Sequence, residues 1–190
     1  SIAEVYGGSF VSVSLRSEFH LNPFDMPAVL EGEEPSEIFK EKIADLLGLI
    51  EIILGKNLSA EELSILDRAL TQTYASFNIL PTTDFSKVEI FPTLNDFEKV
   101  LKSMEGGDVI SEKFYPYTQG NFSGFINQPT TIELEKKIVV FGFRDLVEEL
   151  RPIGMYIALS YIMSRVQREL KKRVVIIDES WWLMKQESGA

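Results

Sequence analysis

A run of apolar residues that ends in two acids constrains the fold of this chain more than any other feature. Residues 174–177 read Val-Val-Ile-Ile, and Asp178 and Glu179 follow directly. Four consecutive β-prone residues with no polar residue among them are typical of a strand that is covered on both faces, as in a parallel sheet between helices. Such a strand carries its last residues to the sheet edge where α/β folds bind ligands. The run therefore predicts an α/β fold with a site at Asp178 and Glu179.

The preceding residues extend this pattern to strand, helix and strand. Residues 138–143 are a second apolar run, and helical spacing of apolar residues continues over about 152–172. One helix between two such runs predicts a right-handed unit with parallel strands. Alternating apolar and polar residues at 9–15 predict a further strand, and 130–134 are a weaker candidate. The inner stripe of the long helix is expected to comprise Leu159, Ile162, Met163, Val166 and Leu170.

The middle of the chain changes to helical periodicity. Three helices are marked by the residues at their ends: Pro35 and Gly55 bound the first, Ser59 with Glu62 begins the second, and Thr93 with Asp96 begins the third. We therefore predict that residues 30–118 form an all-helical insertion, and that 1–29 and 119–190 are parts of one α/β core.

Composition excludes several kinds of site. The chain has no cysteine, so disulfides, cysteine-zinc sites, iron–sulfur clusters and a thiol nucleophile are excluded. With His20 as the one histidine, a histidine metal cage or a Ser-His-Asp triad is not expected. The net charge of −10 does not favour non-specific electrostatic binding to the phosphate backbone of nucleic acid. No stretch reaches the ~20 apolar residues of a membrane span, and no signal peptide opens the chain, so we expect a soluble, intracellular protein.

An apolar strand followed by Asp-Glu is also the pattern of a Walker B motif. In that chemistry Asp178 would hold the Mg²⁺ that bridges the phosphates of ATP, directly or through water, and Glu179 would orient the attacking water. The plainer alternative is that the two acids begin a solvated loop. The companion P-loop, Gly-x-x-x-x-Gly-Lys-Ser/Thr, is absent: Gly55-Lys56 is followed by Asn57 and fits a helix end instead.

Residues 174–184 (Val-Val-Ile-Ile-Asp-Glu-Ser-Trp-Trp-Leu-Met) resemble the Walker B segment of the motor ATPases of type IV secretion and conjugative transfer, the TraC-like, VirB-four class. Further stretches resemble that family in the same order along almost the whole chain. They are Gly7-Gly8, Asn22-Pro-Phe-Asp, the helix from Leu58 to Leu70, Pro92-Thr-Leu-Asn-Asp-Phe, and Gly120 with Phe125-Ile-Asn. Two positions depart from the family: Gly142 stands where an acidic residue is frequent, and Ser180 replaces alanine.

The resemblance implies a partial RecA-like P-loop NTPase core with a helical insertion, cut after its P-loop and just after Walker B. It implies ATP and Mg²⁺ as ligands, Asp178 as metal residue and Glu179 as catalytic residue. It further implies a hexameric parent protein at the inner face of the cell membrane, in contact with other secretion-channel subunits. The isolated piece is then expected to be inactive.

Two alternatives stay open. A related P-loop DNA translocase would share the motif, although the net charge does not support it. The second alternative is that the chain is a structural or interaction fragment without catalytic activity. The acidic stretch 27–70 and the basic residues Arg165, Arg168, Lys171, Lys172 and Arg173 are consistent with solvated surfaces or with contacts to oppositely charged partners.

Overall fold

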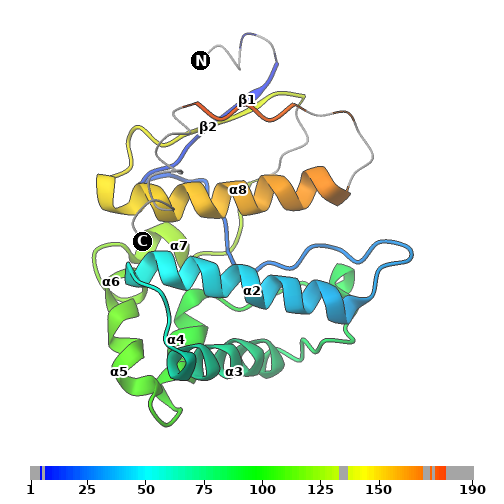
Figure 1. The fold of residues 1–190 in the computed structure, drawn as a ribbon. Coiled ribbons are helices and arrows are strands. Elements are labelled where there is room, and N and C mark those ends of the chain that lie inside the picture. The colour runs from blue at the N-terminus through cyan, green and yellow to red at the C-terminus, as the bar shows by residue number, and fades with distance from the viewer. Residues whose placement is uncertain (1–4, 6, 133–136, 169–171, 173, 179–190) are drawn as a thin grey trace.

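The computed structural model describes residues 5, 7–132, 137–168, 172 and 174–178. Figure 1 shows these residues in three tiers: a small sheet at one end, one long helix beneath it, and a group of helices below that. The structure thus confirms the mixed helix and sheet composition expected from the sequence.

The sheet of the described residues has two parallel strands, β1 (Ser9–Ser12) and β2 (Val139–Gly142). Their register pairs Ser9 with Val139 and Ser12 with Gly142. Both predicted strands at these places are confirmed, although β1 ends three residues earlier than its alternating pattern. The run at 130–134 gives no strand over its described residues 130–132. Thr131 instead donates its backbone N–H to the His20 carbonyl oxygen at 3.0 Å, which places His20 in a loop.

Helix α8 (Arg151–Arg168) follows β2 after a short 3-10 turn, Glu148–Leu150, and runs beneath the sheet (Figure 1). Its buried residues, among those described, are Ile153, Gly154, Ile157 and Ala158. The predicted inner stripe is therefore wrong, since Met163 is 43% exposed and Leu159, Ile162 and Val166 are half-buried, while Leu170 lies outside the described residues. The first turns of α8 are enclosed because Gly154 lets Leu146 and Phe125 approach its backbone closely.

The three predicted helices of the lower tier begin where the sequence predicts, and the first of them also ends there. Helix α2 (Pro35–Leu54) has proline in its first turn and Gly55 in the left-handed conformation at its end. Helices α3 (Ala60–Ser76) and α4 (Leu94–Lys102) both start with the predicted capping boxes, Ser59 with Glu62 and Thr93 with Asp96. The shorter elements of this tier include the 3-10 helix η1 (Phe85–Lys87) between α3 and α4. After α4 come α5 (Gly107–Ser111), the 3-10 helix η2 (Glu112–Phe114), α6 (Tyr115–Thr118) and α7 (Ser123–Ile126).

A chain of aromatic rings forms the centre of the lower tier. The Phe24 ring lies 6.1 Å from that of Tyr74 and 6.0 Å from that of Phe97, and Phe97 meets Phe114 edge-on at 5.4 Å. All four side chains are at most 1% exposed. Because Phe24 belongs to the segment that leaves β1, the strand tier and the helical tier share one hydrophobic core.

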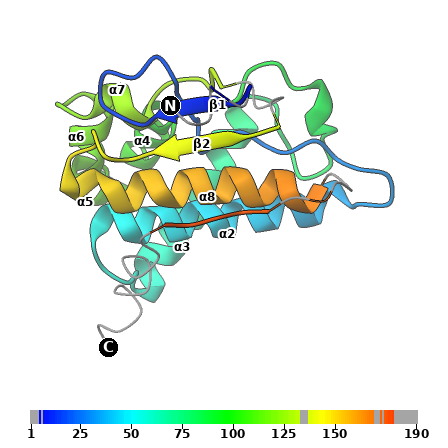
Figure 2. The same ribbon diagram turned by 90° about the horizontal axis from the view of Figure 1, so that it is seen from above.

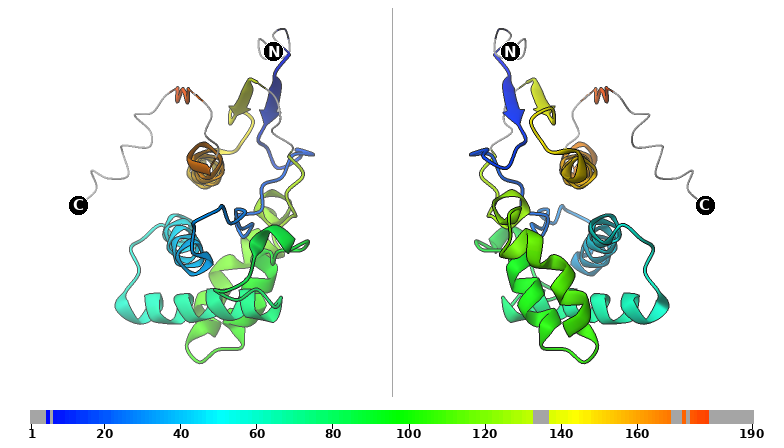
Figure 3. Two further views of the ribbon diagram at one scale, coloured as in Figure 1. Left: turned by 90° about the vertical axis from the view of Figure 1, so that its right-hand side faces the viewer. Right: turned by 90° about the vertical axis from the view of Figure 1, so that its left-hand side faces the viewer.

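The strand predicted at 174–177 is not formed in the structure. These residues carry no ladder hydrogen bonds, and Val174 and Ile176 are both 86% exposed. A strand buried on both faces needs backbone hydrogen bonds to a neighbouring strand and a covering layer on each face of the sheet. Among the described residues the sheet has two strands, with α8 on one face, so neither requirement is met. Figures 2 and 3 nevertheless show the segment level with the sheet, beyond β2 on the side away from β1.

None of the described helices combines the length and hydropathy that a membrane crossing requires.

Candidate functional site

The C-terminal ends of both strands meet at one edge of the sheet. Here Ser12 Oγ, at the end of β1, donates a hydrogen bond to Asp145 Oδ2 at 3.1 Å, just beyond β2. The first turn of α8 lies at the same edge (Figures 1 and 2). This edge is where parallel α/β sheets present their ligand-binding residues.

The predicted site residue Asp178 follows segment 174–177 in the sequence. This segment runs in the same direction as β2, on the side of β2 that faces away from β1 (Figure 2). The Asp178 side chain is exposed. One acid thus follows β2, Asp145, and another follows segment 174–177, Asp178; the sequence analysis singled out only Asp178.

Glu179 lies outside the described residues, so its role as the water-orienting carboxylate stays a prediction. The basic residues near it are described in part. The Arg165 guanidinium lies 5.5 Å above the Tyr161 ring, and Lys172 is exposed, while the side chain of Arg168 and residues Lys171 and Arg173 are not described.

The structure gives a reason for Gly142, where the resembling family often has an acidic residue. A Cβ atom at this position would stand 2.6 Å from Cζ of Phe10. The Phe10 ring therefore occupies the space of a side chain at 142. The acidic group near this strand end is instead Asp145, three residues further on.

The donor set at the edge fits a magnesium ion only together with a phosphate ligand. Within the described part of the chain, no three or more His, Asp or Glu side chains lie close enough together to hold a metal by themselves. Mg²⁺ is commonly held by one or two carboxylates while phosphates and water complete its octahedron. Asp178 fits such a role.

A second polar region lies between α2 and α8, and sequence reasoning did not single it out. Tyr156 Oη donates to the Asp45 carbonyl oxygen at 3.0 Å, and Ser160 Oγ donates to Asp45 Oδ2 at 2.7 Å. Lys42 Nζ lies 3.7 Å from that carboxylate and donates to the Pro23 carbonyl oxygen at 3.1 Å. Burial lowers the pKa of Lys42, an effect that the charges of Asp45 and Asp25 partly oppose. Burial also raises the pKa of Asp25 against a hydrogen bond from Thr130.

Several stretches that resemble the secretion ATPases contact one another. Asn22 Nδ2 donates to the Pro92 carbonyl oxygen at 2.8 Å, and the Asn95 N–H donates to Asn127 Oδ1 at 2.8 Å. Asn22 is 6% exposed, and its Oδ1 accepts the Phe24 N–H. These residues join the segment after β1, the start of α4 and the residues after α7, so their role in the structure is to hold the tiers together.

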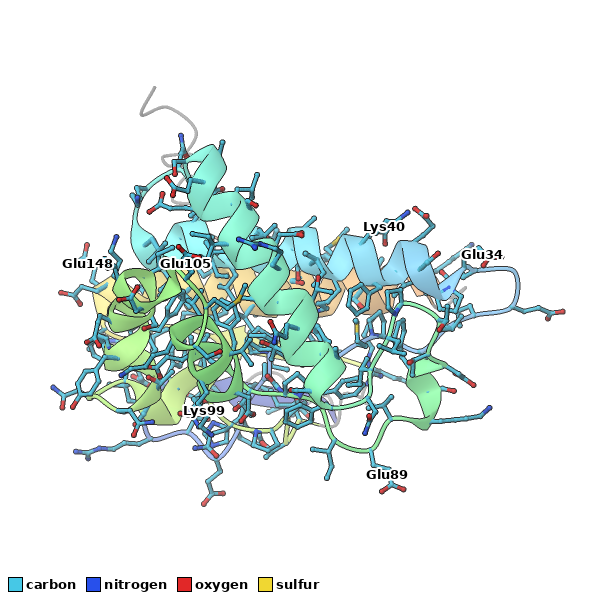
Figure 4. The ribbon with its side chains drawn as sticks, turned by 90° about the horizontal axis from the view of Figure 1, so that it is seen from below. Glu34, Lys40, Glu89, Lys99, Glu105 and Glu148 are labelled. Carbon is cyan, nitrogen blue, oxygen red and sulfur yellow. The ribbon has the colours of Figure 1, made fainter. Side chains whose placement is uncertain are left out.

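The labelled charged residues of the acidic stretch 27–70, Glu34 and Lys40, are exposed. Figure 4 shows both at the outer surface of the molecule, and Glu89, which follows the stretch, also points outward. Lys40 and Lys99 form local ion pairs with Glu37 and Asp96 on their own helices. This arrangement favours the solvated-surface interpretation of the acidic stretch.

Comparisons with known proteins find a structural match. No family model matches the chain, and no curated protein matches its sequence. Among solved structures, VirB4 of Thermoanaerobacter pseudethanolicus matches with a TM-score of 0.83 and 21% sequence identity, over 96% of this chain and 71% of that one. The resemblance expected from the sequence is confirmed at the level of the fold: the chain has the fold of a VirB4 protein.

Proposed function

We propose that the chain is part of a P-loop ATPase that powers substrate transfer or assembly in a type IV secretion or conjugation system. The likeness to VirB4 over almost the whole chain carries this proposal. The direction of segment 174–177, which runs parallel to β2 (Figure 2), supports it, because nucleotide-binding carboxylates follow the C-terminal ends of parallel strands in α/β folds. In this proposal residues 1–29 and 119–190 belong to a RecA-like core, and 30–118 are its helical insertion.

Asp178 would hold Mg²⁺, which supplies charge neutralisation at the phosphates of ATP. Glu179 would accept a hydrogen bond from the attacking water and orient it for in-line attack. The phosphate cradle has to come from residues outside the printed sequence, since no Gly-x-x-x-x-Gly-Lys-Ser/Thr motif is present. The proposal extends to a hexameric parent protein at the inner face of the cell membrane that works with other channel subunits.

The test uses a longer protein that contains this chain together with a phosphate-binding loop. Glu179→Gln keeps the shape of the side chain but removes its charge, so we expect MgATP binding to persist and turnover to fall about 10²–10⁴-fold. Asp178→Asn should weaken the dependence of binding on Mg²⁺. Glu105→Gln, an exposed residue of the helical tier (Figure 4), is the matched control and should leave both unchanged. Wild-type turnover by Glu179→Gln would contradict the assignment of Glu179 as the water-orienting residue.

A second candidate is an interaction fragment without catalysis of its own. It is favoured by one observation, the missing phosphate-binding motif in these 190 residues. Titration calorimetry with MgATP distinguishes the two candidate functions. If the chain is part of an ATPase, we expect no binding by the 190-residue chain and binding by the longer protein. Absence of binding by both would leave only the interaction role. Stimulation of hydrolysis by DNA would move the proposal toward a DNA translocase.

A further inference from the structure

A cavity of about 400 Å³ lies between α2, α8 and the segment that follows β1, and the proposed ATPase chemistry does not use it. Figures 1 and 3 show the two helices stacked on one another. The lining includes the apolar side chains of Met26, Leu49 and Ile157 and the rings of Tyr156 and Tyr161. A cavity of this volume falls in the range of small-molecule sites.

A primary amine, that of Lys42 on α2, lines this interhelical cavity, and its side chain is 14% exposed. Its Nζ donates to the Pro23 carbonyl oxygen at 3.1 Å and lies 3.7 Å from Asp45 Oδ2. An ammonium group has three N–H donors, whereas a neutral amine has two donors and a lone pair. The two oxygens therefore suit the two donors of a neutral amine, and the remaining tetrahedral direction on Nζ then carries the lone pair.

The surroundings of Lys42 favour nucleophilic chemistry. Burial lowers the pKa of Lys42, an effect that the charges of Asp45 and Asp25 partly oppose. A desolvated lysine amine is a nucleophile that forms imines with carbonyl compounds. Asp25 also lines the cavity, and burial raises its pKa against a hydrogen bond from Thr130, so this carboxyl keeps its proton to a higher pH than an exposed one. The cavity thus combines an amine, a proton donor and apolar walls.

We propose that Lys42 forms an imine with a small, uncharged aldehyde that enters the interhelical cavity. The lone pair on Nζ bonds to the carbonyl carbon, the π pair moves to the oxygen, and one N–H proton passes to that oxygen. The second N–H proton leaves with this hydroxyl as water, which gives the C=N bond. Asp25 relays the protons. An anionic aldehyde is disfavoured because Asp25 and Asp45 both act electrostatically on the reacting nitrogen.

The probe is benzaldehyde, added to the full 190-residue chain near neutral pH with cyanoborohydride, which reduces an imine to a stable secondary amine. Peptide mass spectrometry gives the labelling rate of each lysine. Lys42 should be labelled at least about tenfold faster than Lys40, and its rate should saturate as the benzaldehyde concentration rises. Lys40 is the internal control because it is exposed on the same helix and paired with Glu37.

Two results of this experiment would overturn the proposal without any variant. They are labelling of Lys42 that is no faster than that of Lys40, and a rate at Lys42 that rises linearly with benzaldehyde. The matched anionic probe is para-formylbenzoate, which should label Lys42 more slowly than benzaldehyde does. Equal rates with both aldehydes would contradict the preference for an uncharged one.

The pH dependence tests whether the neutral amine is the reacting form. The rate at Lys42 should reach its plateau at a lower pH than the rate of N-acetyl-lysine amide in the same solution. Asp45→Asn removes one carboxylate that stabilises the ammonium form, so it should move this plateau to a still lower pH. A plateau at the same pH as that of the free amide would overturn the proposal. The titratable and charged groups around Lys42 are Asp45 on α2, Asp25 on the segment after β1, and Tyr156, Tyr161 and Arg165 on α8.

A variant that fills the cavity tests where the aldehyde binds. Ser164 on α8 lines the cavity, so Ser164→Trp should slow the labelling of Lys42, abolish its saturation and leave Lys40 unchanged. Ser64→Trp, at an exposed position of α3, is the matched control and should retain the wild-type rate at Lys42. Thermal unfolding shows that each variant is folded. Wild-type labelling of Lys42 in folded Ser164→Trp would place the reaction outside the cavity and overturn the proposal.

Discussion

The ring of Phe10 on β1 lies against the α-carbon of Gly142 on β2. A Cβ atom on Gly142 would stand 2.6 Å from Cζ of Phe10, closer than van der Waals contact allows. Phe10 is paired in register with Val140, so its ring reaches diagonally across to the next outward-facing position. The absence of a side chain at 142 therefore belongs to the packing of the sheet.

This relationship predicts non-additive effects of substitution. Gly142→Ala should lower the free energy of unfolding by about 1 kcal/mol, because Phe10 has to move, although its 40% exposure gives it room to do so. In a Phe10→Ala background the same change should cost less or become favourable, since alanine suits a strand better than glycine. Urea unfolding of the double-mutant cycle measures the difference.

The control is Gly124→Ala, where an added Cβ atom would make ordinary contact with the Leu15 carbonyl oxygen at 3.7 Å. A cost at Gly142 that is the same with and without the Phe10 ring would show that the backbone conformation, rather than the ring, requires glycine there.

The parts of the fold that the sequence predicted well are those that local chemistry determines. Pro35, Gly55 and the two capping boxes satisfy backbone groups at helix ends by contacts within a few residues, and all four are found as predicted. Strand β2 also follows from its own apolar run. These predictions succeed because each depends on a short segment alone.

The predictions that were wrong or incomplete concern residues whose contacts lie far away in the chain. The inner side of α8 is set by Leu146 and Phe125, which approach at Gly154, and no periodicity within α8 encodes their positions. Segment 174–177 has the composition of a buried strand, but a strand also needs a neighbouring edge. For the candidate site, Asp178 was predicted from its pattern. Asp145 was missed because its partner Ser12 lies 133 residues earlier.

Gly48 on α2 should be intolerant of substitution because of Tyr156 on α8. A Cβ atom at Gly48 would stand 2.6 Å from Tyr156 Oη, whose hydroxyl donates to the Asp45 carbonyl oxygen. Gly48→Ala should therefore push the helices apart and lower the free energy of unfolding by about 1–3 kcal/mol, despite the higher helix propensity of alanine. Tyr156→Phe in the same chain should recover part of this loss, because it removes the oxygen that clashes. No recovery in urea unfolding would exclude the hydroxyl as the cause.

The capping box of α3 predicts a loss of stability in acid. Hydrogen bonds from Lys56 and from the Ser59 N–H hold the pKa of Glu62 down from 4.5 to about 2. Because the folded pKa lies below the unfolded one, the stabilisation is complete above about pH 4.5 and is lost as the pH falls toward 2. Unfolding curves between these pH values should show a smaller decline for Glu62→Gln than for the wild type. Glu61→Gln, in the same turn but outside the capping box, should retain the wild-type slope.

Tyr74 joins the helical tier to the segment that follows β1 by one buried hydrogen bond. Its hydroxyl donates to the Phe24 carbonyl oxygen at 2.8 Å, and its side chain is fully buried. Tyr74→Phe keeps the aromatic contacts with Phe24 and Phe39 but leaves that carbonyl without its donor. We expect urea unfolding to show a loss of about 1–3 kcal/mol. Tyr115→Phe, whose side chain is 55% exposed, is the control and should change stability by less than about 0.5 kcal/mol. Equal small losses for both variants would mean that the bond to Phe24 contributes nothing beyond packing.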